Sequence, residues 1–269
     1  MILDVGAYRF HYQSLGTVGQ PAILFLHGFL GSSEDWLEVM ENICQDFHCL
    51  AIDLPGHGKT QVSGDDEFFQ MEKTAKGISD FLNQLGITKS NLVGYSMGGR
   101  LGLYLSLTYP NLFKKSLIES SSPGLKTAEE RAARRLRDEK LALDMVQTDF
   151  SLFLTKWYEL PLFETLKQHP KFSEVFNRRK KNQSAALAKS LRQMGTGVQQ
   201  SLWESLAQAE TTFCFLAGEH DEKFIHIGRR MAKICPKASF HIVPNAGHTT
   251  HIENTEAFLN EMTSFFTEN

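Results

Sequence analysis

The sequence predicts a doubly wound α/β domain, in which a mostly parallel sheet is covered by helices and carries a helical insert. Short apolar runs alternate with longer segments of helical periodicity. Strands buried on both faces of a parallel sheet are apolar almost throughout. Six runs fit that description: Ala22–Leu26, His48–Ile52, Asn91–Tyr95, Lys115–Glu119, Thr212–Ala217 and Ser239–Val243.

The other elements follow from their periodicities. Tyr8–Leu15 alternates between apolar and polar residues, which predicts an antiparallel strand at the sheet edge. Four segments have helical spacing: one capped by Ser32 or Ser33 that continues through Met40, then Glu72–Leu85, Met97–Tyr109 and Glu256–Phe266.

The length of 269 residues suits one large domain, and we expect residues 1–269 to form it, with a helical cap inserted at 125–195. Helical patterns without a strand pattern fill that insert. It holds fifteen Lys or Arg and nine Asp or Glu between Lys126 and Arg192. This surplus predicts either a solvated insert with charged faces or a basic cap that attracts an anionic substrate.

The overall composition narrows the class of protein. A net charge of −3 argues against a nucleic-acid partner. No apolar run approaches the roughly 20 residues that span a bilayer, so we expect no membrane association. Residues 1–4 do not resemble a signal peptide, and the four cysteines form no C-x-x-C pair, which favours reduced thiols in a cytoplasmic protein. The oligomeric state is not predicted.

Gly94-Tyr95-Ser96-Met97-Gly98 matches the G-x-S-x-G pattern of a nucleophile on a sharp turn. A predicted strand precedes it and a predicted helix follows it, as the pattern requires. Side chains at the two glycine positions would collide with neighbouring backbone. Ser96 is therefore the expected catalytic serine, and a tight turn with a bystander serine is the alternative.

A serine hydroxyl needs a proton acceptor, and two later loops can supply the partners. Each loop follows a predicted strand, at the edge where sites of open α/β sheets lie. We predict His248 as the base and Asp221 as the acid that orients it. His251 is a rival base, and Glu219 and Glu222 are rival acids.

Two backbone N–H groups are expected to form an oxyanion hole. One belongs to Met97, directly after the nucleophile, and the other to Phe29 in the loop after Ala22–Leu26. Arg100 lies one helical turn beyond Ser96, where its guanidinium group could bind a carboxylate in a bidentate manner. A surface or salt-bridging role is the alternative for Arg100.

Two other segments partly match known motifs but lack a required residue. Gly56-His57-Gly58-Lys59-Thr60 ends like a phosphate loop, but the position that needs the first glycine is Asp53. The His248-x-x-His251 pair lacks the glutamate of a zinc-protease motif. We therefore expect no nucleotide cofactor and no metal.

The chain resembles the α/β-hydrolase superfamily through its HGF loop, its DLPGHG turn, the serine motif, and GEHDEKF and PNAGHTTH near the end. That resemblance implies an α/β-hydrolase fold with an eight-stranded sheet. Several segments are similar to one family within it, the 2-succinyl-6-hydroxy-2,4-cyclohexadiene-1-carboxylate synthases of menaquinone biosynthesis. These segments are FLHGFLGSSEDW, DLPGHG, GYSMGGR, ESSSPGL, RAARRLRDEK, KWYELPLF, LRQMGTG and LAGEHDEKF.

The resemblance implies a lyase that eliminates pyruvate from a small substrate with three carboxylates, using the serine, histidine and aspartate as a base. It also implies substrate-binding roles for Arg134, Arg179, Trp157 and Tyr95, beside Arg100. Arg135 and Arg178 are alternatives to Arg134 and Arg179, because each is adjacent in the sequence.

Two other functional classes remain. A serine carboxylesterase or C–C bond hydrolase would use Ser96 as a covalent nucleophile. A binding module would keep the three residues without turnover, although a complete set with both oxyanion loops is hard to explain without chemistry.

Overall fold

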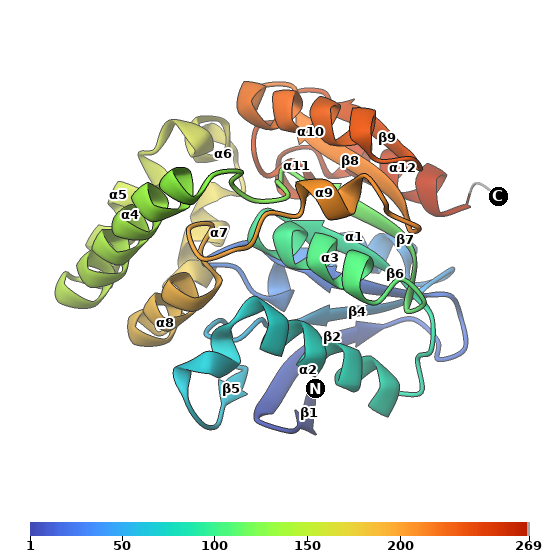
Figure 1. Cartoon of the computed structure of the whole chain (residues 1–269), viewed down its shortest axis with the longest axis horizontal. Coiled ribbons are helices and arrows are strands. Elements are labelled where there is room, and N and C mark those ends of the chain that lie inside the picture. The colour runs from blue at the N-terminus through green and yellow to red at the C-terminus, as the bar shows by residue number, and fades with distance from the viewer. Residues whose placement is uncertain (268–269) are drawn as a thin grey trace.

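The computed structural model describes residues 1–267 and contains a nine-stranded sheet with helices on both faces (Figure 1). The strands are β1 (Ile2–Val5), β2 (Tyr8–Leu15), β3 (Ala22–Leu26), β4 (His48–Ile52), β5 (Gln61–Val62), β6 (Ser90–Tyr95), β7 (Phe113–Glu119), β8 (Thr212–Gly218) and β9 (Ala238–Val243). The helices outside the insert are η1 (Ser33–Trp36), α1 (Leu37–Ile43), η2 (Asp66–Phe69), α2 (Met71–Gln84), α3 (Met97–Thr108), α9 (Trp203–Leu206), α10 (Glu222–Ile234), α11 (Thr250–Glu253) and α12 (Thr255–Thr267).

The strand order is β1-β2-β4-β3-β6-β7-β8-β9, and all pairs from β4 to β9 are parallel. The sheet has nine strands rather than the expected eight, because the two-residue β5 also pairs with β2. β2 is antiparallel, as predicted, but it is not the edge strand. The short β1, for which no strand was predicted, forms a hairpin with it.

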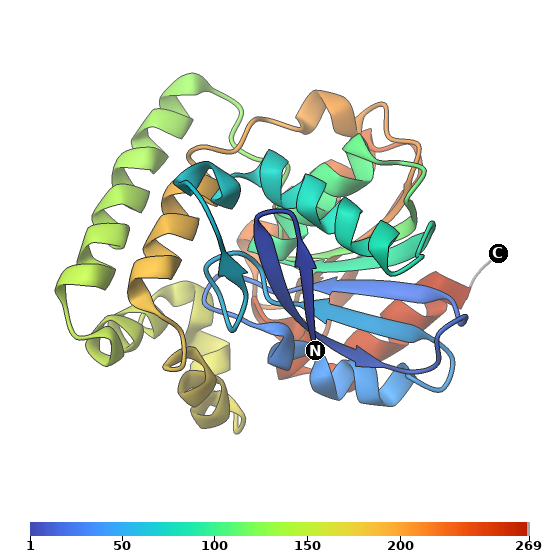
Figure 2. The ribbon, with the colours of Figure 1, turned by 90° about the horizontal axis from the view of Figure 1, so that it is seen from below.

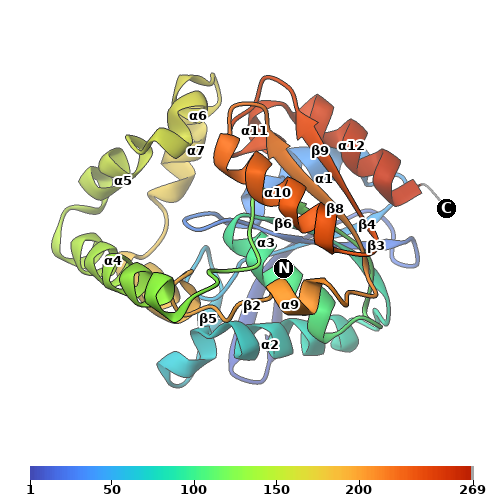
Figure 3. The ribbon, with the colours of Figure 1, turned by 45° about the horizontal axis from the view of Figure 1, so that its top comes forward.

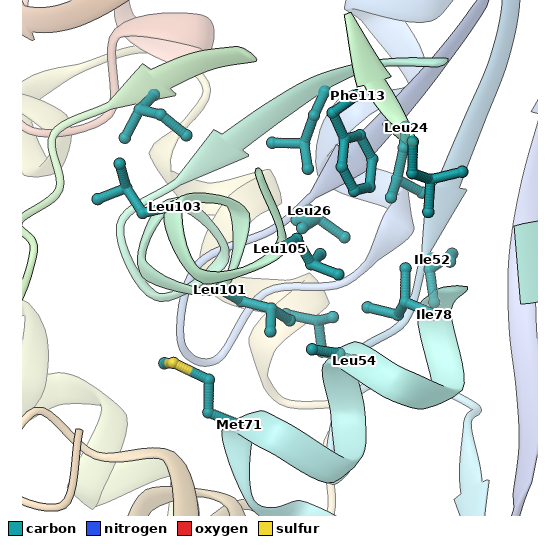
Figure 4. Packing of buried hydrophobic residues seen from close by; sticks show 14 of the residues in the cluster. Leu24, Leu26, Ile52, Leu54, Met71, Ile78, Leu101, Leu103, Leu105 and Phe113 are labelled. Atoms are coloured by element: carbon teal, nitrogen blue, oxygen red, sulfur yellow. The ribbon is translucent and has the colours of Figure 1, made fainter. Parts of the chain in front are cut away.

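The sheet separates two apolar layers, and alternate residues of one strand belong to different layers. Leu24 and Leu26 of β3 pack with α2 and α3, whereas Ile23 and Phe25 pack with α1 and α12. All four side chains are fully buried. Figure 4 shows the first layer, with Leu101 and Leu105 of α3 near Leu26. This two-sided burial explains why the central strands are apolar throughout.

The cap insert lies between β7 and α9 and contains helices but no strand. They are α4 (Ala128–Gln147), α5 (Phe150–Tyr158), η3 (Pro161–Phe163), α6 (Glu164–Gln168), α7 (Phe172–Arg179) and α8 (Ser184–Met194). Figures 2 and 3 show them together beside one end of the sheet. Leu30, from the loop after β3, is buried among apolar residues of α4, α5 and α8, so the cap and the sheet share a core.

Among residues 1–267, no helix combines the length and the apolar character needed to cross a bilayer.

Candidate active site

Ser96 occupies the turn between β6 and α3 in a strained conformation. Its φ is 49° and its ψ is −105°, outside the ordinary regions for a residue with a side chain. Its N–H donates to the carbonyl oxygen of Glu119 on β7, at 3.0 Å. The turn therefore projects the hydroxyl group beyond the carboxyl end of the sheet.

The two glycines of the motif are required by close backbone contacts. A Cβ at Gly98 would lie 2.2 Å from the carbonyl oxygen of Leu26, and one at Gly94 would lie 2.6 Å from that of Gly98. Since both distances are far below van der Waals contact, any side chain would push the helix away from the strand.

The structure brings Ser96, His248 and Asp221 together. His248 Nε2 lies 3.2 Å from Ser96 Oγ, and His248 Nδ1 lies 2.7 Å from Asp221 Oδ2. Asp221 follows β8 and caps α10, and His248 follows β9, so both arrive at the edge where β6 ends. His248 and Asp221 are buried, which strengthens their charge-assisted hydrogen bond.

The rival residues have other partners. Glu219 accepts a hydrogen bond from the N–H of Asn245, and Glu222 is exposed. His251 is held by the buried carboxylate of Glu119, which lies 2.7 Å from its Nδ1. His251 therefore points into the core beneath Tyr95, with the two ring centroids 4.9 Å apart.

Phe29 and Met97 both line the cavity that contains Ser96. Met97 is the first residue of α3, so its N–H lies at the positive end of that helix. The loop of Phe29 is held by His27, whose Nε2 accepts from the N–H of Leu54 at 2.9 Å. Its Nδ1–H must then donate to the carbonyl oxygen of Gly28. Burial lowers the pKa of His27, which favours this neutral form.

A cavity of about 350 Å³ lies between the cap and the sheet edge, with Ser96 and His248 in its wall. Aromatic rings from both parts line it, among them Phe29, Trp157 and Phe163. Counted over the described part of the chain, residues 1–267, its wall also contains five cationic side chains and a single carboxylate, that of Glu130. The cationic residues are Arg100, Lys126, Arg134, Lys223 and Arg230. Such a wall suits a partly apolar ligand with several negative charges.

Arg100 is buried without a carboxylate partner among residues 1–267. Its Nη1 donates to the carbonyl oxygen of Met194 at 2.8 Å and to Gln199 Oε1 at 2.9 Å. Desolvation, together with repulsion from Arg134, lowers the pKa of Arg100 to about 10. A bound carboxylate would offset the free-energy cost of this buried positive charge. The Arg100 guanidinium group is therefore placed to bind an anion.

Three other predicted binding residues line the cavity. Arg134 does so from α4, and its Nε also donates to Asp138 Oδ1 at 2.7 Å. Trp157 and Tyr95 contribute rings, and the Tyr95 hydroxyl group lies 3.0 Å from Thr249 Oγ1.

The structure does not place Arg179 among the residues that line this cavity. Its Nη1 donates to Asp35 Oδ1 at 2.7 Å, and its Nε donates to the Tyr158 hydroxyl group. Its neighbour Arg178 contacts the same carboxylate. Because Asp35 already neutralises this guanidinium group, direct contact with a substrate carboxylate would require the pair to separate.

Several lining residues were not identified from the sequence, notably Lys126, Trp203, Lys223, Phe224 and Arg230. The sequence signal for two of them was available. Lys223 and Arg230 follow Asp221 with Ile227 between them, at the spacing of one helix face. Trp203 and Lys126 are far apart in sequence, and no local pattern connects them.

Fold and site together define an enzyme of the α/β-hydrolase class, and the family model for the alpha/beta hydrolase fold matches residues 21–255. An Escherichia fergusonii protein named 2-succinyl-6-hydroxy-2,4-cyclohexadiene-1-carboxylate synthase is 34% identical over 239 residues, covering 89% of this chain and 91% of the relative. A Bacillus subtilis protein provisionally given the same name is 34% identical over 262 residues, 96% of this chain and 95% of that protein.

The solved structure of MenH from S. aureus superposes with a TM-score of 0.90 at 31% identity, covering 97% of this chain and 98% of that one. The chain belongs to the 2-succinyl-6-hydroxy-2,4-cyclohexadiene-1-carboxylate synthase family of α/β-hydrolase-fold enzymes.

Proposed function

We propose that the chain is a lyase of menaquinone biosynthesis that forms 2-succinyl-6-hydroxy-2,4-cyclohexadiene-1-carboxylate by eliminating pyruvate from 2-succinyl-5-enolpyruvyl-6-hydroxy-3-cyclohexene-1-carboxylate. The observation that carries this proposal is the cavity wall, where a Ser–His–Asp set faces five cations. A neutral ester would gain nothing from that charge, whereas a tricarboxylate would be stabilised by it.

In this proposal Ser96 and His248 act together as the base. The imidazole takes the hydroxyl proton as the serine oxygen removes the ring proton next to the succinyl ketone. Electrons then move into the conjugated ring system, and negative charge develops on the ketone oxygen. The N–H groups of Phe29 and Met97 stabilise that charge, and Asp221 stabilises the imidazolium.

The dienolate then collapses to the diene. The C–O bond to the enolpyruvyl group breaks, and the departing enolate takes up a proton to become pyruvate. The imidazolium is the proton donor, so the enzyme returns to its starting protonation state. No bond to Ser96 is formed, which separates this reaction from that of a serine hydrolase.

Substrate binding in the proposal rests on Arg100 and Arg134 for carboxylates and on Trp157 and Tyr95 for the ring. Arg179 acts on the site through Asp35 rather than by direct contact. A cytoplasmic location belongs to the same proposal, and the free thiols of Cys44, Cys49 and Cys235 agree with a reducing compartment.

The test is whether the protein releases pyruvate from the enolpyruvyl precursor. Pyruvate release is measured in an assay coupled to lactate dehydrogenase. Ser96→Ala should lower kcat by at least about 100-fold, as expected for loss of a general base. Ser205→Ala, on the exposed face of α9, is the matched control and should match the parent protein. Absence of pyruvate with the parent protein would overturn the proposal.

The alternative of a serine carboxylesterase or C–C bond hydrolase predicts a different intermediate. A p-nitrophenyl ester would then give a burst of product, and mass spectrometry would find an acyl group on Ser96. A lyase that uses this serine only to carry a proton gives neither result.

A further inference from the structure

Three of the five cations in the cavity wall have no individual role in the reaction or in substrate binding as proposed so far. Lys126 lies in the segment that enters the cap, and Lys223 and Arg230 lie on α10. Among residues 1–267 none of these three side chains forms an ion pair with a carboxylate. In contrast, Arg178 and Arg179 of the cap share Asp35, and Arg192 binds Glu139.

The α10 residues form one stripe that faces the cavity. Lys223, Ile227 and Arg230 are spaced four and then three residues apart, so they lie along one helix face. At a rise of about 1.5 Å per residue, the Cα of Arg230 lies roughly 10 Å farther along α10 than that of Lys223. Because α10 begins directly after Asp221, the helix that carries the catalytic acid also carries this stripe.

The indole ring of Trp203 contacts both Arg230 and Lys126. The guanidinium carbon of Arg230 lies 4.7 Å from the indole ring centroid, and Lys126 Nζ lies 4.9 Å from it. The indole N–H donates to the carbonyl oxygen of Gly124 at 3.0 Å, which fixes the ring next to the segment of Lys126. Both cations are therefore oriented by one aromatic side chain while their charges remain available.

We propose that Arg230, Trp203 and Lys126 form a carboxylate subsite that binds the succinyl arm of the substrate, an assignment that rests on the proposed function. The ring carboxylate and the enolpyruvyl carboxylate must remain beside the reacting ring. The succinyl carboxylate stands at the end of a flexible two-methylene arm, so it alone can extend along the wall. Arg230 supplies the bidentate donors, Lys126 a second charge, and the indole a surface for the methylenes.

The charge of Lys223, on the same stripe as Arg230, favours an anion in this part of the cavity. Desolvation, with repulsion from Arg134, lowers the pKa of Lys223, so a bound anion would relieve an existing electrostatic cost at the wall. Asp221 has the opposite effect and raises the pKa of Lys223, but its carboxylate is already hydrogen-bonded to His248.

Arg230→Gln tests the subsite, and Arg229→Gln is its matched control. Arg229 is exposed on the same helix and does not line the cavity. Its substitution therefore removes the same charge without changing the subsite. We expect Arg230→Gln to raise KM at least 10-fold and to leave kcat within about 3-fold of the parent value. The rise in KM corresponds to the loss of one charged hydrogen-bonding partner of the substrate. Arg229→Gln should change KM by less than 2-fold.

A substrate analogue separates the succinyl carboxylate from the other two. When that carboxylate is replaced by an amide, the KM of the parent protein should rise toward that of Arg230→Gln, and the variant should lose nothing more. If Arg230→Gln still weakens the amide analogue 10-fold, Arg230 binds another group and the assignment to the succinyl arm is overturned.

Direct binding distinguishes failure of the subsite from failure of the proposed function. Calorimetry with Ser96→Ala protein measures substrate affinity without turnover, and we expect at least 10-fold weaker binding when Arg230→Gln is added. If the parent protein releases pyruvate but Arg230→Gln equals Arg229→Gln, only the subsite is overturned. If it releases none, succinate titrated against the tryptophan fluorescence of Trp157→Phe protein still tests the subsite, because this substitution removes the other indole that lines the cavity. Quenching that Arg230→Gln abolishes supports it, and quenching that survives overturns it.

Discussion

Arg179 of the cap donates a 2.7 Å hydrogen bond to Asp35 of the sheet domain, and both side chains are buried. Arg178 donates to the same carboxylate oxygen at 3.1 Å. Burial alone would raise the pKa of Asp35, but the two guanidinium groups hold it well below its usual range. The pair joins α7 to the segment that follows Phe29, and so it connects the position of the cap with the loop that carries Phe29.

Asp35→Asn should therefore destabilise the protein and loosen the cap. Removing one partner of a buried ion pair leaves an uncompensated charge and costs about 3–5 kcal/mol. Urea unfolding measures that loss, and limited proteolysis should cut the cap faster. Glu174→Gln is the control, because Glu174 pairs with Arg178 at the surface, and such pairs contribute about 1 kcal/mol or less. Equal effects of the two substitutions would contradict the role of Asp35.

Arg100→Gln should weaken substrate use because, within residues 1–267, no carboxylate is paired with the Arg100 guanidinium group. Loss of one charged hydrogen-bonding group corresponds to about 1.5–3 kcal/mol, or roughly 10–150-fold in kcat/KM. Arg100→Lys keeps a charge but loses the bidentate geometry, so it should recover only part of the loss. Steady-state kinetics of the parent protein, Arg100→Lys and Arg100→Gln checks this order of kcat/KM. Arg192→Gln is the control and should be unaffected, because Arg192 pairs with Glu139 outside the cavity.

Asp53 should make folding stability depend on pH in the acid range. Burial raises its pKa, but hydrogen bonds from His11 and from the N–H groups of Lys59 and Ser33 outweigh this and lower it to about 2. The carboxylate therefore contributes stability above its ordinary pKa, and that contribution is lost as pH falls toward 2. A shift of this size corresponds to roughly 2 kcal/mol.

Urea unfolding of parent and Asp53→Asn proteins between pH 6 and pH 2.5 checks this direction. We expect the gap in unfolding free energy to narrow as the solution becomes more acidic. A gap that stays constant over this range would show that the charge of Asp53 contributes nothing. Asp46→Asn, at an exposed position, serves as the control.

Glu119→Gln should lower kcat with little change in KM, because Glu119 positions the loop that carries His248. Its carboxylate accepts from Thr250 Oγ1 at 2.7 Å and contacts His251 Nδ1 at the same distance. Loss of the charge should cost about 1.5–3 kcal/mol of stability. Kinetics and thermal unfolding measure the two effects, and Glu256→Gln, exposed on α12, is the control. A change in KM alone would contradict a positioning role.

The central strands and the serine turn were predictable because their signals are local. Ala22–Leu26 is apolar at every position since both faces of β3 are covered, and Gly94 and Gly98 mark a turn that tolerates no Cβ. The edge of the sheet was less predictable. Ile2–Val5 has only four residues, which is too short to identify as a strand until β2 lies beside it.

The order of strands and loops along the chain predicted that Ser96, Asp221 and His248 would lie together, because parallel strands bring their carboxyl ends to one edge. Local sequence could not show that Glu119 would hold His251 in the core, or that Asp35 would neutralise Arg179. Local sequence also could not show that Trp203 would contact both Lys126 and Arg230. These contacts join segments far apart in the chain, and their partners are set by how the cap packs on the sheet.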